Sequence, residues 1–221
     1  MNMNQHNQFW EFFNKTAAPE LALREKTFRR IFQYLDLIDG PVIIVETGCA
    51  RLKDNWAGDG QSTVMFDNYI SFRDESSQVF SVDINPQNVS ECKKLVSERT
   101  VVTNDDSVHF LNPLSRNLEN NKQFISLLYL DSFDLDADYW FQSAAHHLKE
   151  LTAVMRCIDN KTLVVVDDCP LHASFVPTEK DQIAFVGNPS VGGKGRLVSE
   201  FANAVGAKLE FAEYQAGWTG F

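Results

Sequence analysis

Acidic side chains stand directly after four of the short apolar runs in this sequence. They are Glu46, Asp83, Asp131 and the adjacent pair Asp167 and Asp168. If the runs are parallel strands, their carboxyl ends lie along one edge of the sheet, where ligands bind in such folds. We therefore expect these five carboxylates to lie along one edge, where they can accept hydrogen bonds from hydroxyl groups or hold a cation.

The elements that must position these acids alternate along the chain. Apolar runs rich in β-branched residues occupy 42–45, 79–82, 101–103, 125–130 and 163–166, and segments of helical pattern occupy 62–72, 86–96, 107–111 and 139–158. This alternation predicts β-α-β units and an α/β fold with a mainly parallel sheet. Because the strands are apolar throughout, we expect helices on both faces.

The two ends of the chain have a different texture. Residues 1–40 predict an N-terminal helical extension, with 41–221 forming one domain. Phe9, Trp10, Phe12 and Phe13 form an aromatic cluster, interpreted as part of a packed amphipathic helix, with a lid or a dimer contact as the alternative. Toward the C-terminus we expect a short strand at 183–186, a helix at 196–205 and a last strand at 208–214.

The composition limits the classes of function. The chain has 221 residues, a net charge of −10, and 17 Phe and 4 Trp, which predicts a folded core and excludes disorder as the main state. The acidic balance argues against binding nucleic acid or an anionic membrane. No apolar stretch of 18 residues occurs, and the four cysteines are widely spaced, so we expect reduced thiols and a cytoplasmic protein. A homo-oligomer is left open.

Three of the acids have the spacing of a metal site. If the strands at 125–130 and 163–166 are neighbours, their ends lie about 4.8 Å apart, so Asp131, Asp167 and Asp168 can converge. Left unpaired, they would repel one another, and a divalent cation would remove that repulsion. Oxygen ligands alone favour Mg²⁺, Mn²⁺ or Ca²⁺. The alternative is that Asp167 and Asp168 cap a turn before Pro170 and bind no metal.

Asp83 has the position of an acid that accepts hydrogen bonds from the two hydroxyls of a ribose. Gly48, in the loop after the first strand, lets a ligand approach the backbone. Together they indicate a nucleoside cofactor, without separating a nicotinamide dinucleotide from S-adenosylmethionine.

Five motifs occur in order: Val-Glu-Thr-Gly-Cys at 45–49, Val-Asp-Ile-Asn-Pro at 82–86, Asp-Asp-Ser at 105–107, Leu-Tyr-Leu-Asp at 128–131 and Val-Val-Asp-Asp at 165–168. This series resembles the class I S-adenosylmethionine-dependent methyltransferases, most closely the metal-dependent O-methyltransferases of the catechol and macrolide-sugar kind. The resemblance covers about residues 42–170. It implies a Rossmann-like sheet of seven strands in the order 3-2-1-4-5-7-6, with the seventh antiparallel.

The resemblance also implies roles for individual residues. Glu46 and Gly48 would lie beside the methionine part of S-adenosylmethionine, Asp83 on its ribose, and Asp106 and Ser107 at its adenine. Asp131 would contact both the cofactor and a divalent cation, Mg²⁺ being the first choice, and Asp167 and Asp168 would complete the metal site. The long segment 49–57 departs from the compact loop of the family.

The implied reaction is methyl transfer to a hydroxyl of a small molecule, such as a sugar or a natural product. A bound cation would lower the pKa of that hydroxyl, and a base would take its proton. The resemblance makes Asp134 the first candidate base, and His172 is the second. His146 and His147 lie inside a predicted helix and are interpreted as structural.

Two other functions stay open at this stage: a nicotinamide-dependent oxidoreductase, and a non-catalytic module that binds a partner through the aromatic cluster. Gly193-Lys194-Gly195 lacks the Ser or Thr that completes a phosphate loop, so it is interpreted as a turn that leads into a helix, with a mobile flap as the alternative.

Overall fold

The computed structural model describes residues 3–136, 138–177 and 183–221, without the side chains of 3–6 and 171–189. Its centre is a seven-stranded sheet of order β3-β2-β1-β4-β5-β9-β8. The strands are β1 (Ile43–Thr47), β2 (Gln78–Asp83), β3 (Thr100–Asn104), β4 (Leu127–Leu130), β5 (Leu163–Val166), β8 (Lys208–Ala212) and β9 (Ala216–Thr219). The first five run parallel, and β9 is antiparallel to both β5 and β8. The predicted strand order is confirmed; the strand expected over 208–214 is β8, and β9 lies beyond that range.

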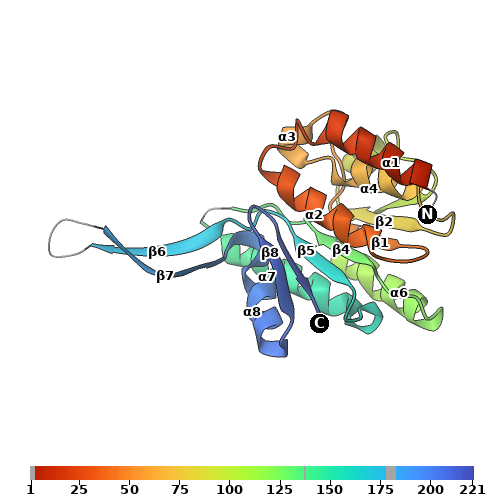
Figure 1. Cartoon of the computed structure of the whole chain (residues 1–221). Coiled ribbons are helices and arrows are strands. Elements are labelled where there is room, and N and C mark those ends of the chain that lie inside the picture. Colours follow the sequence, from red (N-terminus) through yellow and green to blue (C-terminus); the bar gives the residue numbers. More distant parts are fainter. Residues whose placement is uncertain (1–2, 137, 178–182) are drawn as a thin grey trace.

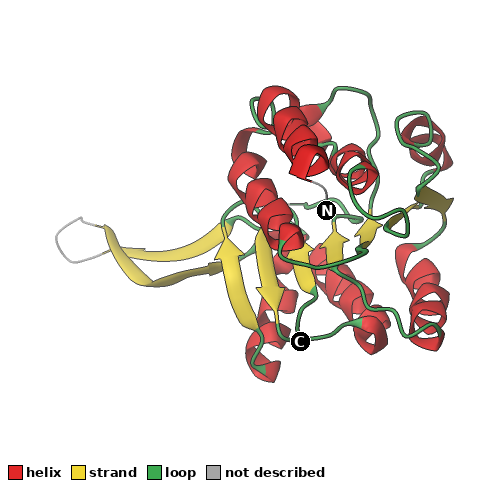
Figure 2. Ribbon diagram, turned by 45° about the vertical axis from the view of Figure 1, so that its right-hand side comes forward, coloured by secondary structure: helices red, strands yellow, loops and turns green. Residues whose placement is uncertain are grey.

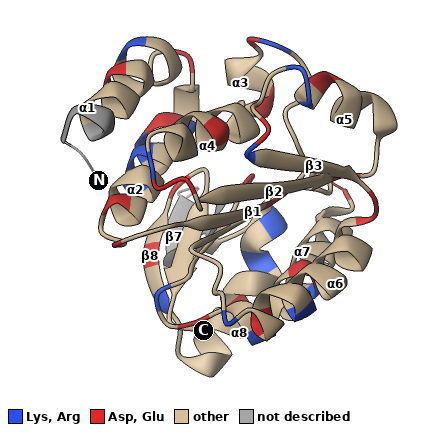
Figure 3. Ribbon diagram, turned by 90° about the vertical axis from the view of Figure 1, so that its right-hand side faces the viewer, with Lys and Arg blue, Asp and Glu red and all other residues tan. Residues whose placement is uncertain are grey.

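Helices cover both faces of the sheet, as the apolar strands predicted (Figures 1 and 3). One face carries α1 (Met3–Phe12), α2 (Glu25–Asp36) and α4 (Ser62–Ser71). The other carries α6 (Ser107–Asn120), α7 (Trp140–Val154) and α8 (Arg196–Val205). The short helices α3 (Trp56–Asp59) and α5 (Pro86–Cys92) follow β1 and β2. Because successive strand side chains alternate in direction, Ile44 packs on the first face and Val45 on the second.

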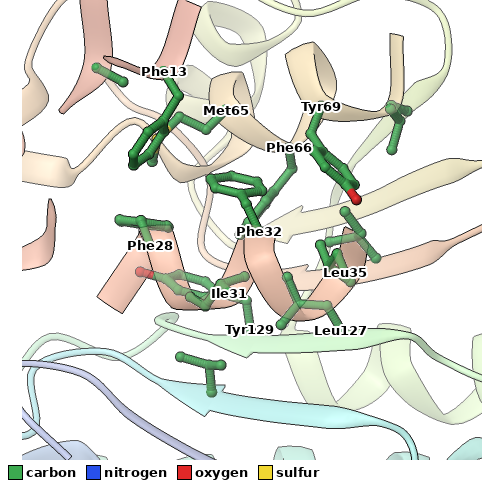
Figure 4. Packing of buried hydrophobic residues seen from close by; sticks show 14 of the residues in the cluster. Phe13, Phe28, Ile31, Phe32, Leu35, Met65, Phe66, Tyr69, Leu127 and Tyr129 are labelled. Atoms are coloured by element: carbon green, nitrogen blue, oxygen red, sulfur yellow. The ribbon is translucent and has the colours of Figure 1, made fainter. Parts of the chain in front are cut away.

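The N-terminal aromatic cluster belongs to the core. Phe9 and Phe13 are fully buried and pack against Phe32 of α2, with ring centroids 4.6 and 5.6 Å from that ring. Phe32 in turn meets Phe66 of α4, and Phe28 stacks on Tyr129 of β4 (Figure 4). The packed-helix interpretation is therefore confirmed. The division of the chain at residue 40 stays a prediction, since α1 and α2 share one core with the sheet.

Helix α6 extends well beyond the segment 107–111 that its pattern predicted. Its N-cap is Asp106, whose Oδ1 accepts a hydrogen bond from the backbone N–H of His109 at 2.9 Å. The helix continues across Pro113 because Leu111, Leu114 and Leu118 all pack into the core beneath the sheet. Tertiary burial here outweighs the local cost of an internal proline.

A two-stranded hairpin separates β5 from α8. It pairs β6 (Leu171–Pro177) with β7 (Ile183–Val191) and extends away from the rest of the molecule (Figures 1 and 2). The short strand expected at 183–186 is part of β7, but neither β6 nor the hairpin was predicted. His172, the second candidate base, lies in β6 with its side chain outside the described part of the chain.

Two composition-based expectations can be compared with the described residues. All four cysteines are free thiols and buried. None of the described helices combines the length and the apolar character needed to cross a lipid bilayer.

We predict that Phe32→Ala lowers the free energy of unfolding by about 3–5 kcal/mol, because it opens a cavity among fully buried rings. Leu37→Ala, at the end of the same helix, is the control: Leu37 is 81% exposed, so its loss should cost less than about 0.5 kcal/mol. Urea denaturation followed by circular dichroism measures both. Equally small losses of stability for the two variants would contradict a core that the N-terminal helices share with the sheet.

Candidate functional site

The carboxyl ends of β1, β2, β4 and β5 open into one cavity of about 610 Å³. Asp83 from the end of β2, Asp131 from the end of β4 and Asp168 from the end of β5 all line it. Residues separated by 85 positions in the sequence thus share one cavity, as the strand-end pattern predicted. Asp134 also lines the cavity, but its side chain is 88% exposed and its nearest cation is Arg51, at 3.9 Å.

Asp83 is held in place by its own loop. Its Oδ1 accepts a hydrogen bond from the backbone N–H of Asn85 at 2.7 Å, and the Asn88 amide donates to both carboxylate oxygens at 3.3 Å. The backbone N–H of Cys49 adds a longer contact to Oδ2 at 3.4 Å. These donors fix the direction of the carboxylate at the cavity wall and leave it exposed to a ligand.

Gly48, directly after β1, lies close against the backbone that follows β4. Its φ is +82°, and a Cβ atom there would lie 2.7 Å from the carbonyl oxygen of Asp131. Any larger residue would therefore push the ends of the two strands apart. The glycine predicted to let a ligand approach the backbone is also required to bring Asp131 to the cavity.

The surroundings of Glu46 differ from the predicted contact with a cofactor. It is fully buried and does not line the cavity. Its oxygens accept hydrogen bonds from the hydroxyls of Ser62, Thr63 and Ser81 at 2.5, 2.7 and 2.6 Å. Glu46 therefore fixes the start of α4 to β2, next to Gly48, and its direct contact with a cofactor stays a prediction.

Asp106 and Ser107 stand at the start of α6, and neither lines the cavity. Asp106 caps the helix, as described above. The Ser107 hydroxyl lies 2.9 Å from Nε2 of His146. Their contact with an adenine likewise stays a prediction.

The long segment after Gly48 forms one wall of the cavity through Arg51, Gly58 and Asp59. The Asp59 carboxylate holds the segment in shape, because it accepts hydrogen bonds from the backbone N–H groups of Arg51 at 3.0 Å and Gln61 at 3.2 Å. The insertion that departs from the compact family loop is thus an ordered part of the site.

Two cations stand among the acids at the ends of β4 and β5, and the sequence analysis assigned neither to the site. The Lys194 ammonium is ion-paired with Asp131 and lies 2.9 Å from Oδ2 of Asp168. The Arg24 guanidinium donates from Nε to Oδ2 of Asp167 at 2.8 Å and lies 3.4 Å from Oδ1 of Asp168. Three carboxyl groups therefore meet two cations, and burial raises the pKa of Asp131 against the attraction of Lys194.

The burial of this cluster makes the pairing strong. Burial by itself would lower the pKa values of Lys194 and Arg24, but the attraction of Asp131 and Asp168 for Lys194, and of Asp167 for Arg24, outweighs it and raises both. Burial likewise acts to raise the pKa of Asp168, yet Lys194 and the Tyr214 hydroxyl bring it below its usual value. Lys194 is therefore a cation at neutral pH.

The side chains present do not fit the predicted divalent cation. Asp167 is fully buried, and its two oxygens are taken by Arg24 and by the backbone N–H of Asp168, which donates at 2.9 Å. Asp131 and Asp168 face Lys194. Within the described residues, no three acidic, His or Cys side chains are arranged to hold a metal ion. The argument for a metal assumed unpaired carboxylates, and that assumption is wrong.

Glu150 of α7 is a further buried acid, and its hydrogen bonds hold the strand ends that carry the site. It accepts hydrogen bonds from the hydroxyls of Thr47 at 3.1 Å and Ser132 at 2.5 Å, which ties α7 to the ends of β1 and β4. His146 lies 3.3 Å from the same carboxylate, and this hydrogen bond raises the pKa of the imidazole. His147 is fully buried, which lowers its pKa to about 4. The structural interpretation of the two histidines fits these contacts.

No known family profile matches the chain, and no curated protein matches it. Solved structures do. A putative rRNA-methylase from Clostridium thermocellum is 13% identical, with 88% of this chain and 97% of that chain covered and a TM-score of 0.51. A protein described as a pericyclic reaction enzyme is 12% identical, with 86% and 47% covered and a TM-score of 0.50. DhpI in complex with SAH is 11% identical, with 98% and 95% covered and a TM-score of 0.48.

The chain has the class I methyltransferase fold. The order of the strands and the antiparallel direction of β9 both agree with those that the sequence motifs implied. The cavity lies at the edge where those motifs end.

The burial of Glu46 gives a testable pH dependence. Burial raises the pKa of Glu46 to about 7, against three hydroxyl donors that act to lower it. The folded protein therefore holds this proton more tightly than the unfolded chain. Stability from this group is complete below about pH 4.5 and is lost as the pH rises through 7.

We predict that Glu46→Gln, which cannot ionise, gains stability relative to the unsubstituted protein by about 3 kcal/mol between pH 4.5 and pH 8. Chemical denaturation at several pH values measures the difference. Leu37→Ala, which alters an exposed and non-ionisable side chain, should run parallel to the unsubstituted protein at every pH. A constant difference for Glu46→Gln would contradict the raised pKa.

Proposed function

We propose that this protein is an S-adenosylmethionine-dependent methyltransferase that acts on a hydroxyl group of a small molecule. The observation that carries the proposal is the single cavity at the carboxyl edge of a class I methyltransferase fold, which is lined by Asp83, Asp131 and Asp168. An acid suited to a ribose and acids suited to a reacting hydroxyl thus lie within reach of one bound cofactor.

Asp83 is the proposed ribose-binding residue. A carboxylate that is already oriented by Asn85 and Asn88 can accept both ribose hydroxyls without further ordering. Gly48 leaves the backbone open beside the cofactor's methionine part. The sulfonium of S-adenosylmethionine is positively charged, and an acidic cavity favours it.

The proposed chemistry is an in-line substitution. The acceptor oxygen attacks the methyl carbon, an oxygen–carbon bond forms, and the sulfur–carbon bond breaks with its electron pair left on sulfur, which gives S-adenosylhomocysteine. The hydroxyl proton must pass to a base in the same step. Two carboxylates at the cavity, Asp131 and Asp134, have the chemistry to accept it.

We favour Asp131 as that base. It lies at the cavity wall beside Gly48, and Lys194 occupies its Oδ1, while its Oδ2 makes no hydrogen bond to the described residues. Asp134, the base implied by the resemblance, is mostly in solvent at the rim, where water competes for its oxygens. His172 stays a prediction. No step of this mechanism passes through a divalent cation, because the acids do not fit one.

A small acceptor agrees with both the cavity and the charge. A volume of about 610 Å³ is of the size that holds one cofactor with a small molecule. The neighbour from Clostridium thermocellum is named for an rRNA acceptor. In contrast, this chain has a net charge of −10, which disfavours a polyanionic acceptor.

We predict that saturating S-adenosylhomocysteine raises the melting temperature by about 5–11 °C, because a ligand that binds only the native state stabilises it by about 2.7 kcal/mol at a hundredfold excess over its Kd. NAD should leave it unchanged. Differential scanning fluorimetry measures both. Stabilisation by NAD instead would support the oxidoreductase alternative, and stabilisation by neither would contradict the proposed function.

Asp83→Asn should weaken S-adenosylhomocysteine binding by about 10- to 100-fold, since it removes hydrogen bonds to a charged acceptor. Glu98→Gln is the matched control, because Glu98 is an exposed acid away from the cavity. Isothermal titration calorimetry measures both affinities. Equal affinities for the two variants would remove Asp83 from the cofactor site.

A further inference from the structure

The turn Gly193-Lys194-Gly195 is fitted closely against the segment that follows β5. A Cβ atom on Gly193 would lie 2.2 Å from the carbonyl oxygen of Asp168, and one on Gly195 would lie 2.4 Å from Sγ of Cys169. The backbone N–H of Lys194 donates to the Asp168 carbonyl at 3.2 Å. Both glycines are thus required for this approach, and they fix the backbone from which the Lys194 side chain starts.

From that backbone the Lys194 side chain runs through the interior to the cavity wall. The residue is 1% exposed, and its ammonium reaches Asp131 at the end of β4 and Asp168 at the end of β5. These strands are neighbours in the sheet. A single positive charge therefore stands between two acids at the position where the sequence predicted a divalent metal.

The other oxygens of Asp167 and Asp168 are also supplied with donors. Arg24 pairs with Asp167 and contacts Oδ1 of Asp168, and the Tyr214 hydroxyl donates to that same oxygen. The Arg24 guanidinium lies 4.7 Å above the Tyr214 ring, which holds it in place. A divalent cation could enter only by displacing the ammonium or by lying beside it, and both are unfavourable.

We propose that Lys194 is a resident cation that takes the place of a divalent metal and holds Asp131 and Asp168 in position at the cavity. Lys194 is a positioning residue: its side chain is 1% exposed and reaches the cavity wall, where its ammonium is paired with the two carboxylates that line the same cavity. That these carboxylates face a methyl acceptor rests on the proposed function. The assignment of Lys194 as the cation of the cluster does not depend on the proposed function.

The test is direct binding of Mn²⁺ to the full chain, followed by electron paramagnetic resonance, with no methyl transfer involved. The unsubstituted protein should show no saturable site at this cluster below about 1 mM Mn²⁺. Lys194→Met removes the charge and keeps the length, so Asp131 and Asp168 are left unpaired and Mn²⁺ binding should tighten at least about tenfold. Lys194→Arg, which keeps the charge, should show no gain.

Two further arms locate the site. Adding Asp168→Asn to Lys194→Met should abolish the gained Mn²⁺ binding. The melting temperature of Lys194→Met should rise in MnCl₂ but not in NaCl of the same ionic strength. The proposal is overturned if a folded Lys194→Met gains no Mn²⁺ affinity. It is also overturned if the unsubstituted protein binds Mn²⁺ and Asp168→Asn removes that binding. This second outcome can be measured even if the Lys194 variants do not fold. S-adenosylhomocysteine binding, measured separately, reports on the proposed function.

Discussion

Carboxylates that collect at the edge of a parallel sheet must be neutralised, and this requirement organises the site. Here the neutralising charges are Lys194 and Arg24, which come from the turn before α8 and from the turn before α2. Breaking a buried ion pair by removing one partner costs about 3–5 kcal/mol. The pairs therefore tie two distant parts of the chain to the ends of β4 and β5 and give the cavity a defined wall.

The rest of the fold serves to place that edge. Apolar strands buried on both faces carry acidic residues at their carboxyl ends, and three of these acids, Asp83, Asp131 and Asp168, line the cavity. Gly48 allows β1 and β4 to approach at that edge, and the buried Glu46 and Glu150 hold the adjoining helices to it. The N-terminal helices complete one face and, through Arg24, contribute directly to the site.

Local sequence signals predicted what depends on local structure. The five parallel strands and the shared cavity of Asp83 and Asp168 followed from apolar runs and from the residues after them, whereas the strand order followed from the resemblance of the motifs to a known family. The last strand was expected over 208–214, which covers β8 but not β9, and the turn at residues 213–215 carries neither glycine nor proline to mark where β8 ends. The hairpin β6–β7 pairs only with itself, so no burial pattern set by the core could indicate it.

The cations were missed because their partners are distant. Arg24 and Asp167 are 143 positions apart. The sequence does not distinguish a buried arginine at the start of an amphipathic helix from an arginine at the surface. Lys194 did carry a local signal, a lysine between two glycines, but the segment was interpreted as a turn that leads into a helix or as a flap, and the lysine was not considered as a counter-ion. Buried acids require counter-ions, but the sequence did not show that these acids are buried. The expected metal was assigned as their counter-ion instead.

The central claim is that one cavity holds a nucleoside on Asp83 while lysine, not metal, stands between Asp131 and Asp168. An anomalous difference map from crystals grown with S-adenosylhomocysteine and MnCl₂, collected at the manganese edge, tests it most directly. The account predicts ribose density on Asp83, the Lys194 ammonium between the two acids, and no anomalous peak there. A manganese peak bound by Asp131 and Asp168, with Lys194 turned away, would contradict it.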